Sequence, residues 1–499
     1  MNAPASPLLA SPRPTGDLSA RVAEARLSAA EVDASCRRAL LLLFVSGAIW
    51  LVLGIFLALI SSIKLHAPGF LAGPAWLTLG RVRPAAMNAI LYGFASQAGL
   101  GVLLWLFCRL GRMRLLFQPT LLIGIAFWNL GVTLGIIGIL AGDTTGFEWL
   151  EMPSYVPPML FVSYALIGVC AMSAFYLRRE RALYVSHWYL LAALFWFPWI
   201  YSAASLLLIF HPVRGVVQSI VDAWFSSSFL VLWLGPISLG AIFYFIPKLT
   251  GRPLYSRSLA AFGFWTLAFF GNWAGPAKLV GGPVPAWIAS TGIAANLLLL
   301  IPLISVAINW HQTLRGLYSQ VKEDLALRFT VIGAASYLLA SLLNIVLSLR
   351  EVSAVTHLTY VEAGQVQLAL LGFVAMTLFG SIHYIVPRVM NVAWPCQKLL
   401  QTHFWGSAVG IALIVVGLMA GGVVQGLEIN NPSVPFINVV RSTVPFLGIG
   451  TLGELVLLAG QVALLWNLTL LLRQHVEPWR KTVAGVAMES RFEPEARRS

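Results

Sequence analysis

The stretch VEAGQVQLALLGFVAMTLFGSIHYIVPR (residues 361–388) indicates what kind of fold this chain adopts. It is mainly apolar over more than twenty residues and ends in a Pro-Arg pair. A helix of about 20 apolar residues spans the hydrocarbon core of a bilayer. Two glutamines, Gln365 and Gln367, stand near one end of this run. Buried polar groups are costly in a membrane helix, so these two amides need an explanation.

The rest of the chain repeats this apolar pattern. Of the 499 residues, 59% are hydrophobic and only 10% are charged, which is less charge than soluble domains carry. Membrane-spanning backbone must satisfy its own hydrogen bonds, so the spans are expected to be helical. The sequence therefore predicts an all-α integral membrane protein, a bundle of twelve transmembrane helices at about residues 38–62, 85–108, 118–141, 157–177, 188–210, 224–246, 258–276, 284–308, 326–348, 364–386, 402–424 and 446–472.

Basic residues alternate from loop to loop along the chain. If the N-terminus is cytoplasmic, the inward loops carry 14 Lys and Arg and the outward loops carry 7. The outward loop 142–151 holds only acidic charges. Cytoplasmic loops are normally the basic ones, so both termini are expected in the cytoplasm. The same alternation explains the net charge of +13 as a topology signal, and no nucleic-acid partner is predicted.

This pattern divides the chain into three parts. Residues 1–37 are predicted to be a cytoplasmic N-terminal tail, residues 38–472 the twelve-helix membrane domain, and residues 473–499 a cytoplasmic C-terminal tail. The first 35 residues contain no apolar core segment, so no cleaved signal peptide is expected.

Candidate metal ligands are scarce and scattered. The four cysteines never form a C-x-x-C motif, and no predicted helix carries two histidines four residues apart. A haem or copper site needs imidazoles that converge at short range, and the sequence predicts no such cluster. His383, deep in the tenth span, is the one candidate ligand, with a core or water-bonded histidine as the alternative interpretation.

Two charged residues inside or beside the spans are also candidate functional groups. Glu454 is the only acid well inside a span, where a charge is costly. It is interpreted either as a carboxyl that exchanges protons or binds a partner, or as a hydrogen-bonding group between helices. Lys278 lies near the outer end of the seventh span and is a candidate pocket residue.

Several motifs in order resemble one family of membrane enzymes. They are GRVRP (80–84) followed by Asn88, FYFIPKLTGRPLYS (243–256), FWTLAFFGNWAGP (264–276) and SIHYIVPR (381–388). Together with twelve spans, they resemble subunit I of the C-class (cbb-type) haem–copper oxidases over roughly residues 75–475. The resemblance implies that family's fold. In the family, this subunit is the catalytic part of a cytochrome c oxidase in aerobic respiration and holds two haem groups and copper.

The family's metals are held by six histidines, and this chain lacks all of them. The haem-ligand positions implied by the resemblance hold Ala86, Gln365 and Gln367, and the copper-ligand positions hold Ser227, Ala277 and Lys278. We call these six residues the vacated positions. Alanine has no donor atom, and serine and glutamine oxygens are poor ligands for haem iron or copper. We therefore predict no catalytic residue, no metal site and no cofactor bound in the family manner.

The main hypothesis is a non-catalytic scaffold or assembly subunit of a respiratory electron-transfer complex. It would be a multi-pass protein of the bacterial inner membrane, with lipids and other respiratory subunits, including haem-c-bearing ones, as partners. Two alternatives stay open. One is an active terminal oxidase with unusual haem ligation, and the other is a transporter or channel that uses the vacated haem cavity. Side chains with water, or a lipid, would otherwise refill such a cavity, because an empty one is costly.

Overall fold

The computed structural model describes residues 28–492, with side chains described through residue 474. Residues 1–27 and 493–499 of the two predicted tails lie outside this range. Between residues 28 and 492 the regular structure is entirely helical. The main helical units are α2 (Ala29–His66), α3–η2–α4 (Leu79–Gly111), α5 (Gln118–Ala141), α6 (Val156–Tyr176), α7–η3 (Val185–Phe210), α8–η4–α9 (Val216–Thr250), α10 (Arg257–Gly271), α11 (Ala286–Leu298) with α12 (Leu300–Leu314), α14 (Leu325–Leu347), α16–η6–α17 (Tyr360–Met390), α18 (Gln397–Ile429) and α19 (Phe436–Phe492).

The all-α membrane fold predicted from the sequence is confirmed, and eleven of the described helical units are long and apolar enough to cross a membrane. The predicted seventh span is occupied by α10, which has only 15 residues, followed by the short turn η5 (Gly275–Leu279). A helix of that length spans about 22 Å, which is less than the hydrocarbon core of about 30 Å. A twelfth crossing and a cytoplasmic location of both termini therefore remain predictions.

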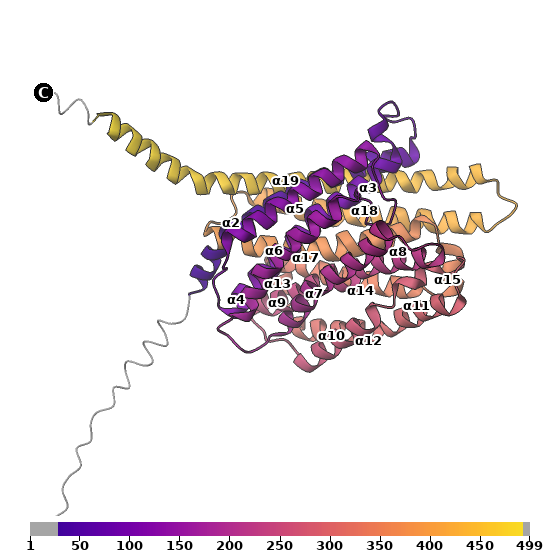
Figure 1. The fold of residues 1–499 in the computed structure, drawn as a ribbon, viewed down its shortest axis with the longest axis horizontal. Helices are drawn as coiled ribbons and strands as arrows, with labels where there is room; N and C mark the ends of the chain where they lie inside the picture. The colour runs from indigo at the N-terminus through magenta and orange to yellow at the C-terminus, as the bar shows by residue number, and fades with distance from the viewer. Residues whose placement is uncertain (1–27, 493–499) are drawn as a thin grey trace, which may run out of the picture.

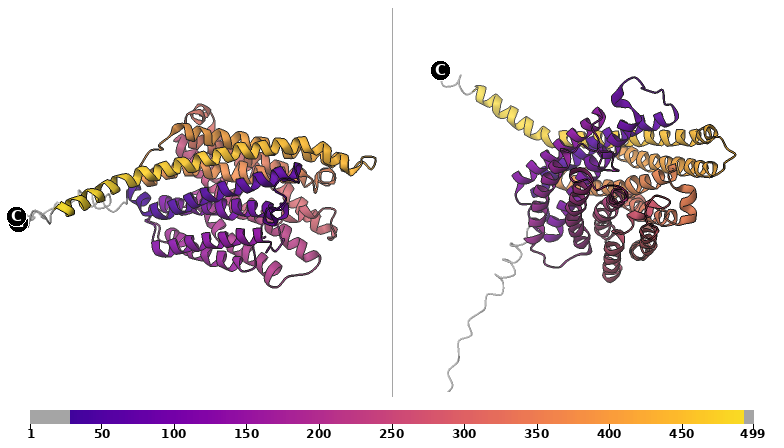
Figure 2. Two further views of the ribbon diagram at one scale, coloured as in Figure 1. Left: turned by 90° about the horizontal axis from the view of Figure 1, so that it is seen from above. Right: turned by 45° about the vertical axis from the view of Figure 1, so that its right-hand side comes forward.

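The helices run side by side in one bundle (Figures 1 and 2). Short connecting elements such as η1 (Ala75–Leu77), α13 (Tyr318–Glu323) and α15 (Arg350–Thr356) lie between the long units in the chain. Helix α2 begins, and α19 runs out, at the same end of the bundle, which is the left end in Figure 1. Both helices also reach into the segments predicted as tails, since α2 begins at Ala29 and α19 ends at Phe492.

Three helical units form the centre of the bundle. In α3–η2–α4, α8–η4–α9 and α16–η6–α17, the most apolar windows are 100%, 89% and 100% buried, against 50% or less in the other candidate spans. We call these three units the central helices. The other spans turn roughly half or more of their surface outward, as lipid-facing helices do.

Each central helix contains a π-helical segment in its middle. These segments are η2 (Ala89–Ala95), η4 (Phe229–Leu234) and η6 (Leu368–Ala375). The backbone N–H of Gly235 bonds the carbonyl of Leu230, five residues earlier, and Pro236 follows directly. A proline inside a helix removes one hydrogen bond and crowds the preceding turn, so the wider π turn accommodates it.

Helices α18 and α19 form an antiparallel pair at one side of the bundle (Figure 1), and we call them the outer pair. Their backbones approach closely at glycines. A Cβ on Gly410 would lie 2.7 Å from the backbone nitrogen of Leu457, and one on Gly453 would lie 2.7 Å from the carbonyl oxygen of Gly410. Real Cβ atoms do not approach backbone so closely, so only glycine allows this crossing.

Candidate functional site

The vacated positions of the central helices lie directly before the π-helical segments. Ala86 precedes η2, Ser227 precedes η4, and Gln365 and Gln367 precede η6. π-helical turns are rare in proteins as a whole, but those that occur are often found at functional sites. They turn side chains away from the regular α-helical direction. The structure thus brings the four residues to corresponding places on three adjacent helices.

The side chains at these positions are engaged in packing and helix contacts. Ala86 is buried in α3 (Leu79–Asn88) against α2, where a Cβ on Gly54 would lie 3.3 Å from the Ala86 carbonyl oxygen. The Gln365 amide nitrogen donates to the backbone oxygen of Ala340 on α14, at 3.2 Å. Gln367 differs, because its buried Oε1 has no hydrogen-bond partner within residues 28–474. None of these residues offers an imidazole or sulfur donor, so the donor set does not fit haem iron or copper.

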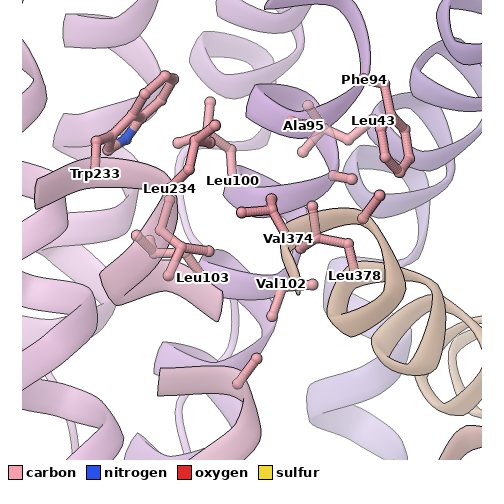
Figure 3. Packing of buried hydrophobic residues seen from close by; sticks show 14 of the residues in the cluster. Leu43, Phe94, Ala95, Leu100, Val102, Leu103, Trp233, Leu234, Val374 and Leu378 are labelled. Atoms are coloured by element: carbon pink, nitrogen blue, oxygen red, sulfur yellow. The ribbon is translucent and has the colours of Figure 1, made fainter. Parts of the chain in front are cut away.

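The interior beside the three π-helical segments is filled with apolar side chains (Figure 3). Trp233 and Leu234 come from η4, Leu100 and Leu103 from α4 (Ser96–Gly111), and Val374 from η6. All five are buried, with at most 1% of their surface exposed. This dense packing is the ordinary state of a protein core.

Lys278 lies in η5 and is held by two oxygen atoms. Its Nζ lies 3.1 Å from Oε2 of Glu148 and 3.1 Å from Oγ of Ser226, and it sits 5.8 Å from the ring centre of Trp149. The pair is partly exposed, with 39% and 43% of the two side chains accessible. The contact is made to Ser226 and not to Ser227 at the vacated copper position.

The acidic loop 142–151 carries the partners of this lysine and of Asn88. The Asn88 amide nitrogen donates to Oε2 of Glu151 at 2.7 Å, and the backbone N–H of Glu148 donates to the carboxylate of Asp222 at 3.1 Å. Burial raises the pKa of Glu151 to about 7. Burial also acts to raise the pKa of Glu148, but the nearby Lys278 charge and the Ser226 hydroxyl outweigh it and hold that pKa below its usual value. The loop thus contains one carboxyl that stays charged and one poised near neutral pH.

Glu454 is buried in α19, with 6% of its surface exposed. Its Oε2 has no hydrogen-bond partner among the described side chains. Gln461 lies seven residues further along the same helix and donates to the Ser407 hydroxyl at 2.9 Å. The structure therefore places Glu454 in the outer pair, away from the vacated positions in sequence and in element.

His383 is not isolated, which corrects the prediction that no imidazoles converge. Its Nε2 lies 2.9 Å from Nδ1 of His403, and both rings are buried. His383 lies seven residues before the end of α17 (Met376–Met390), and His403 is the seventh residue of α18. Two antiparallel helices joined by a short loop place residues equidistant from the loop at the same depth. Counting the two histidines from that loop would have predicted this contact from the sequence.

A pocket of about 270 Å³ lies between α7 (Val185–Ser205), α10 and η4. Trp196, Trp199, Phe269, Trp273 and the Asn272 amide form most of its wall. Three of these rings are at least half exposed on the outside of the bundle. The pocket therefore opens toward the lipid-facing surface.

Comparisons with known proteins agree with this architecture. The family described as cytochrome c and quinol oxidase polypeptide I matches residues 38–456. A "Cytochrome c oxidase subunit 1 homolog" of Azorhizobium caulinodans is 26% identical, covering 84% of this chain and 79% of the relative. The "Cbb3-type cytochrome c oxidase subunit CcoN1" of Stutzerimonas stutzeri is also 26% identical, covering 84% and 91%.

A solved structure supports the fold alone. It is described as a cryo-EM structure of a heme-copper terminal oxidase dimer, and it matches with a TM-score of 0.64 at 14% identity, covering 87% of this chain and 84% of that one. The family match extends over most of the chain, from the first span into the last. This chain therefore belongs to the family of cytochrome c and quinol oxidase polypeptide I.

Proposed function

We propose that this multi-pass membrane protein is a non-catalytic subunit of a respiratory electron-transfer complex, acting as a scaffold or in assembly. It would lie in the inner membrane of a bacterium and contact other respiratory subunits, including haem-c-bearing ones. The observation that carries the proposal is the state of the vacated positions on the central helices. The chain belongs to a family whose relatives are named as oxidase subunits. Its residues at the vacated positions nevertheless offer no imidazole or sulfur donor.

The contacts of these residues support the proposal further. The Gln365 amide is bonded to α14, and the Lys278 ammonium is bonded to Glu148 and Ser226. Such contacts stabilise the surrounding helices, which is what a scaffold requires of these positions. A role in assembly needs only the family's outer shape, which the central helices and the outer pair maintain.

The proposal is tested by the haem content of the purified chain. We would express it beside the S. stutzeri relative in the same host and measure haem by absorbance after reduction. We expect no measurable haem in this chain, whereas about two haem groups per chain would overturn the proposal.

Copper needs a separate comparison. Copper is measured in the wild type and in a His383→Gln, His403→Gln double variant. The double variant lacks the buried histidine pair, so any copper that it retains is assigned to the vacated positions. Retained copper together with oxygen consumption from reduced cytochrome c would favour the active oxidase instead.

A further inference from the structure

The His383–His403 pair is the strongest feature that the proposed function does not use. Its hydrogen bond employs Nε2 of His383 and Nδ1 of His403. The other nitrogen of each ring, Nδ1 of His383 and Nε2 of His403, is buried without a partner among the described residues. These two nitrogens are the ones that would carry hydrogen if the two facing nitrogens bound a metal ion.

We propose that this pair is a Cu(I) site, with one monovalent copper ion held between Nε2 of His383 and Nδ1 of His403. The ion takes the place of the hydrogen that now bridges the two rings. This inference goes beyond the scaffold function and does not depend on it, because it concerns neither the central helices nor the vacated positions.

The charge of the site selects a monovalent ion. Two neutral imidazoles carry no negative charge, and within residues 28–474 no third His, Cys, Asp or Glu joins them in a metal-binding group. A divalent ion would bring two uncompensated charges into a low-dielectric interior, which is very costly. Zn²⁺ also requires four ligands in structural sites. Cu(I) brings one charge and accepts two nitrogen ligands in a line.

Aromatic rings surround the pair and favour a cation. The ring centre of Phe329 lies 5.0 Å from that of His383, in a stacked arrangement, and 5.0 Å from that of His403. The ring of Phe379 meets that of His403 in a T-shaped arrangement at 4.6 Å between centres, and the ring centre of Trp394 lies 5.2 Å from that of His383. The faces of aromatic rings attract cations, most strongly where water is excluded.

Binding requires a small movement and releases no proton. Metal–imidazole bonds are about 2 Å long, so a linear ion needs the two nitrogens about 4 Å apart, against 2.9 Å in the structure. The proton between the rings moves to the other nitrogen of its own ring, and both imidazoles stay neutral. No electron is transferred, and the site gains the single charge of the ion.

Gln461 supplies an outer contact for the metal-bound form. Its amide lies against His403, and its buried Oε1 has no partner among the described atoms. With copper on Nδ1, the Nε2 of His403 carries hydrogen and can donate to that oxygen. Metal-binding histidines usually donate their other N–H to an oxygen in this way.

Trp394 lies over the site in the loop 391–396 between α17 and α18. Its Nε1 donates to the backbone oxygen of His383 at 3.1 Å. This ring is only half-buried, so it separates the pair from the solvent at the end of the bundle. We expect Trp394→Ala to speed copper exchange without removing the site.

The buried thiols of Cys36 and Cys108, which interact with each other, are an alternative binding site for Cu(I) in this chain. Thiols bind metals as thiolates, so two of them would leave a net negative charge with Cu(I) in an apolar interior. The neutral histidine pair binds without losing a proton. A Cys36→Ser variant therefore belongs in the test.

The test is a titration of the purified full-length chain with Cu(I) alone, under anaerobic conditions and against a coloured Cu(I) chelator. We expect one ion per chain, two nitrogen ligands by X-ray absorption, and at least tenfold weaker binding in His383→Gln and in His403→Gln. His187→Gln, which changes a lone buried histidine, is the matched control and should bind as the wild type does. Gel filtration shows whether each variant is folded.

Three results would overturn the proposal. One is copper binding that is unchanged in the folded His383→Gln, His403→Gln double variant. Another is the absence of copper binding in the wild type. The third is sulfur ligation together with loss of copper in Cys36→Ser. Failure of this test leaves the haem measurement untouched, because no vacated position is altered.

Discussion

The central helices are buried and the outer pair is partly exposed, and the two regions are held together in different ways. The central helices are interrupted by π-helical segments and are joined to their surroundings by side-chain contacts such as Asn88–Glu151 and Gln365–Ala340. The outer pair consists of regular helices whose backbones touch at Gly410 and Gly453. We therefore expect substitutions of polar side chains to affect stability most in the centre, and substitutions of glycine to affect it most in the outer pair, which also has the Gln461–Ser407 hydrogen bond.

The largest expected effect comes from adding bulk to the outer pair. Gly410→Leu places a side chain against the backbone of α19, and we expect the free energy of unfolding to fall by about 3 kcal/mol. Gly448→Leu is the matched control, because a Cβ there meets nothing within 4 Å. Thermal unfolding in detergent measures both. Equal losses in the two variants would break the contrast between the regions.

The next effect is a pH dependence at the rim of the central helices. The raised pKa of Glu151 means that the folded chain holds a proton that the unfolded chain loses, so stability falls as pH rises from about 4.5 to about 7. Glu151→Gln should remove this fall and stabilise the chain at pH 8 by on the order of 2 kcal/mol. Unfolding at pH 5 and pH 8 checks it, and an unchanged profile in the variant would contradict it.

The two glutamines of α16 (Tyr360–Gln367) should differ from each other. Gln365→Leu removes the side-chain donor to the Ala340 carbonyl and should cost about 1 kcal/mol, whereas Gln367→Leu removes an unpartnered amide oxygen and should cost close to nothing. Thermal unfolding of the two variants measures the difference. If Gln367→Leu were the more damaging change, a water or ligand contact at Gln367 would be indicated.

A loss smaller than that of Gln365→Leu is expected at Lys278. Because Lys278 lowers the pKa of Glu148, the pair contributes stability above the ordinary carboxyl pKa and loses it as pH falls through the folded pKa. Both side chains are partly exposed, so Lys278→Met should cost below about 1 kcal/mol at pH 7. Unfolding at pH 7 and pH 3 measures it. A loss that persisted at pH 3 would show that packing, not charge, is what Lys278 provides.

Much of the fold could be predicted from the sequence, because long apolar runs indicate spans directly. The predicted span at 118–141 coincides with α5, and 157–177 differs from α6 by one residue at each end. The seventh span was predicted too long, because apolar composition continues past Gly271 while the helix ends there. Composition records hydrophobicity and does not record where the backbone turns.

The site was predicted less completely. The vacated positions follow from a resemblance in sequence, but the engagement of Lys278 with Glu148 joins residues 130 positions apart and needs the fold. The same holds for His383 and His403, which lie on different helices. Periodicity along one helix cannot reveal contacts between two helices.

The π-helical segments have a practical consequence for anyone who rebuilds a site in this scaffold. An α-helix turns about 100° per residue, but a π turn takes more residues to complete a circle. Gln367 and Met376 are therefore out of phase with the spacing that a regular helix would give. Designed ligands have to be counted separately on each side of η2, η4 and η6, because residue spacing across these segments does not follow the α-helical repeat.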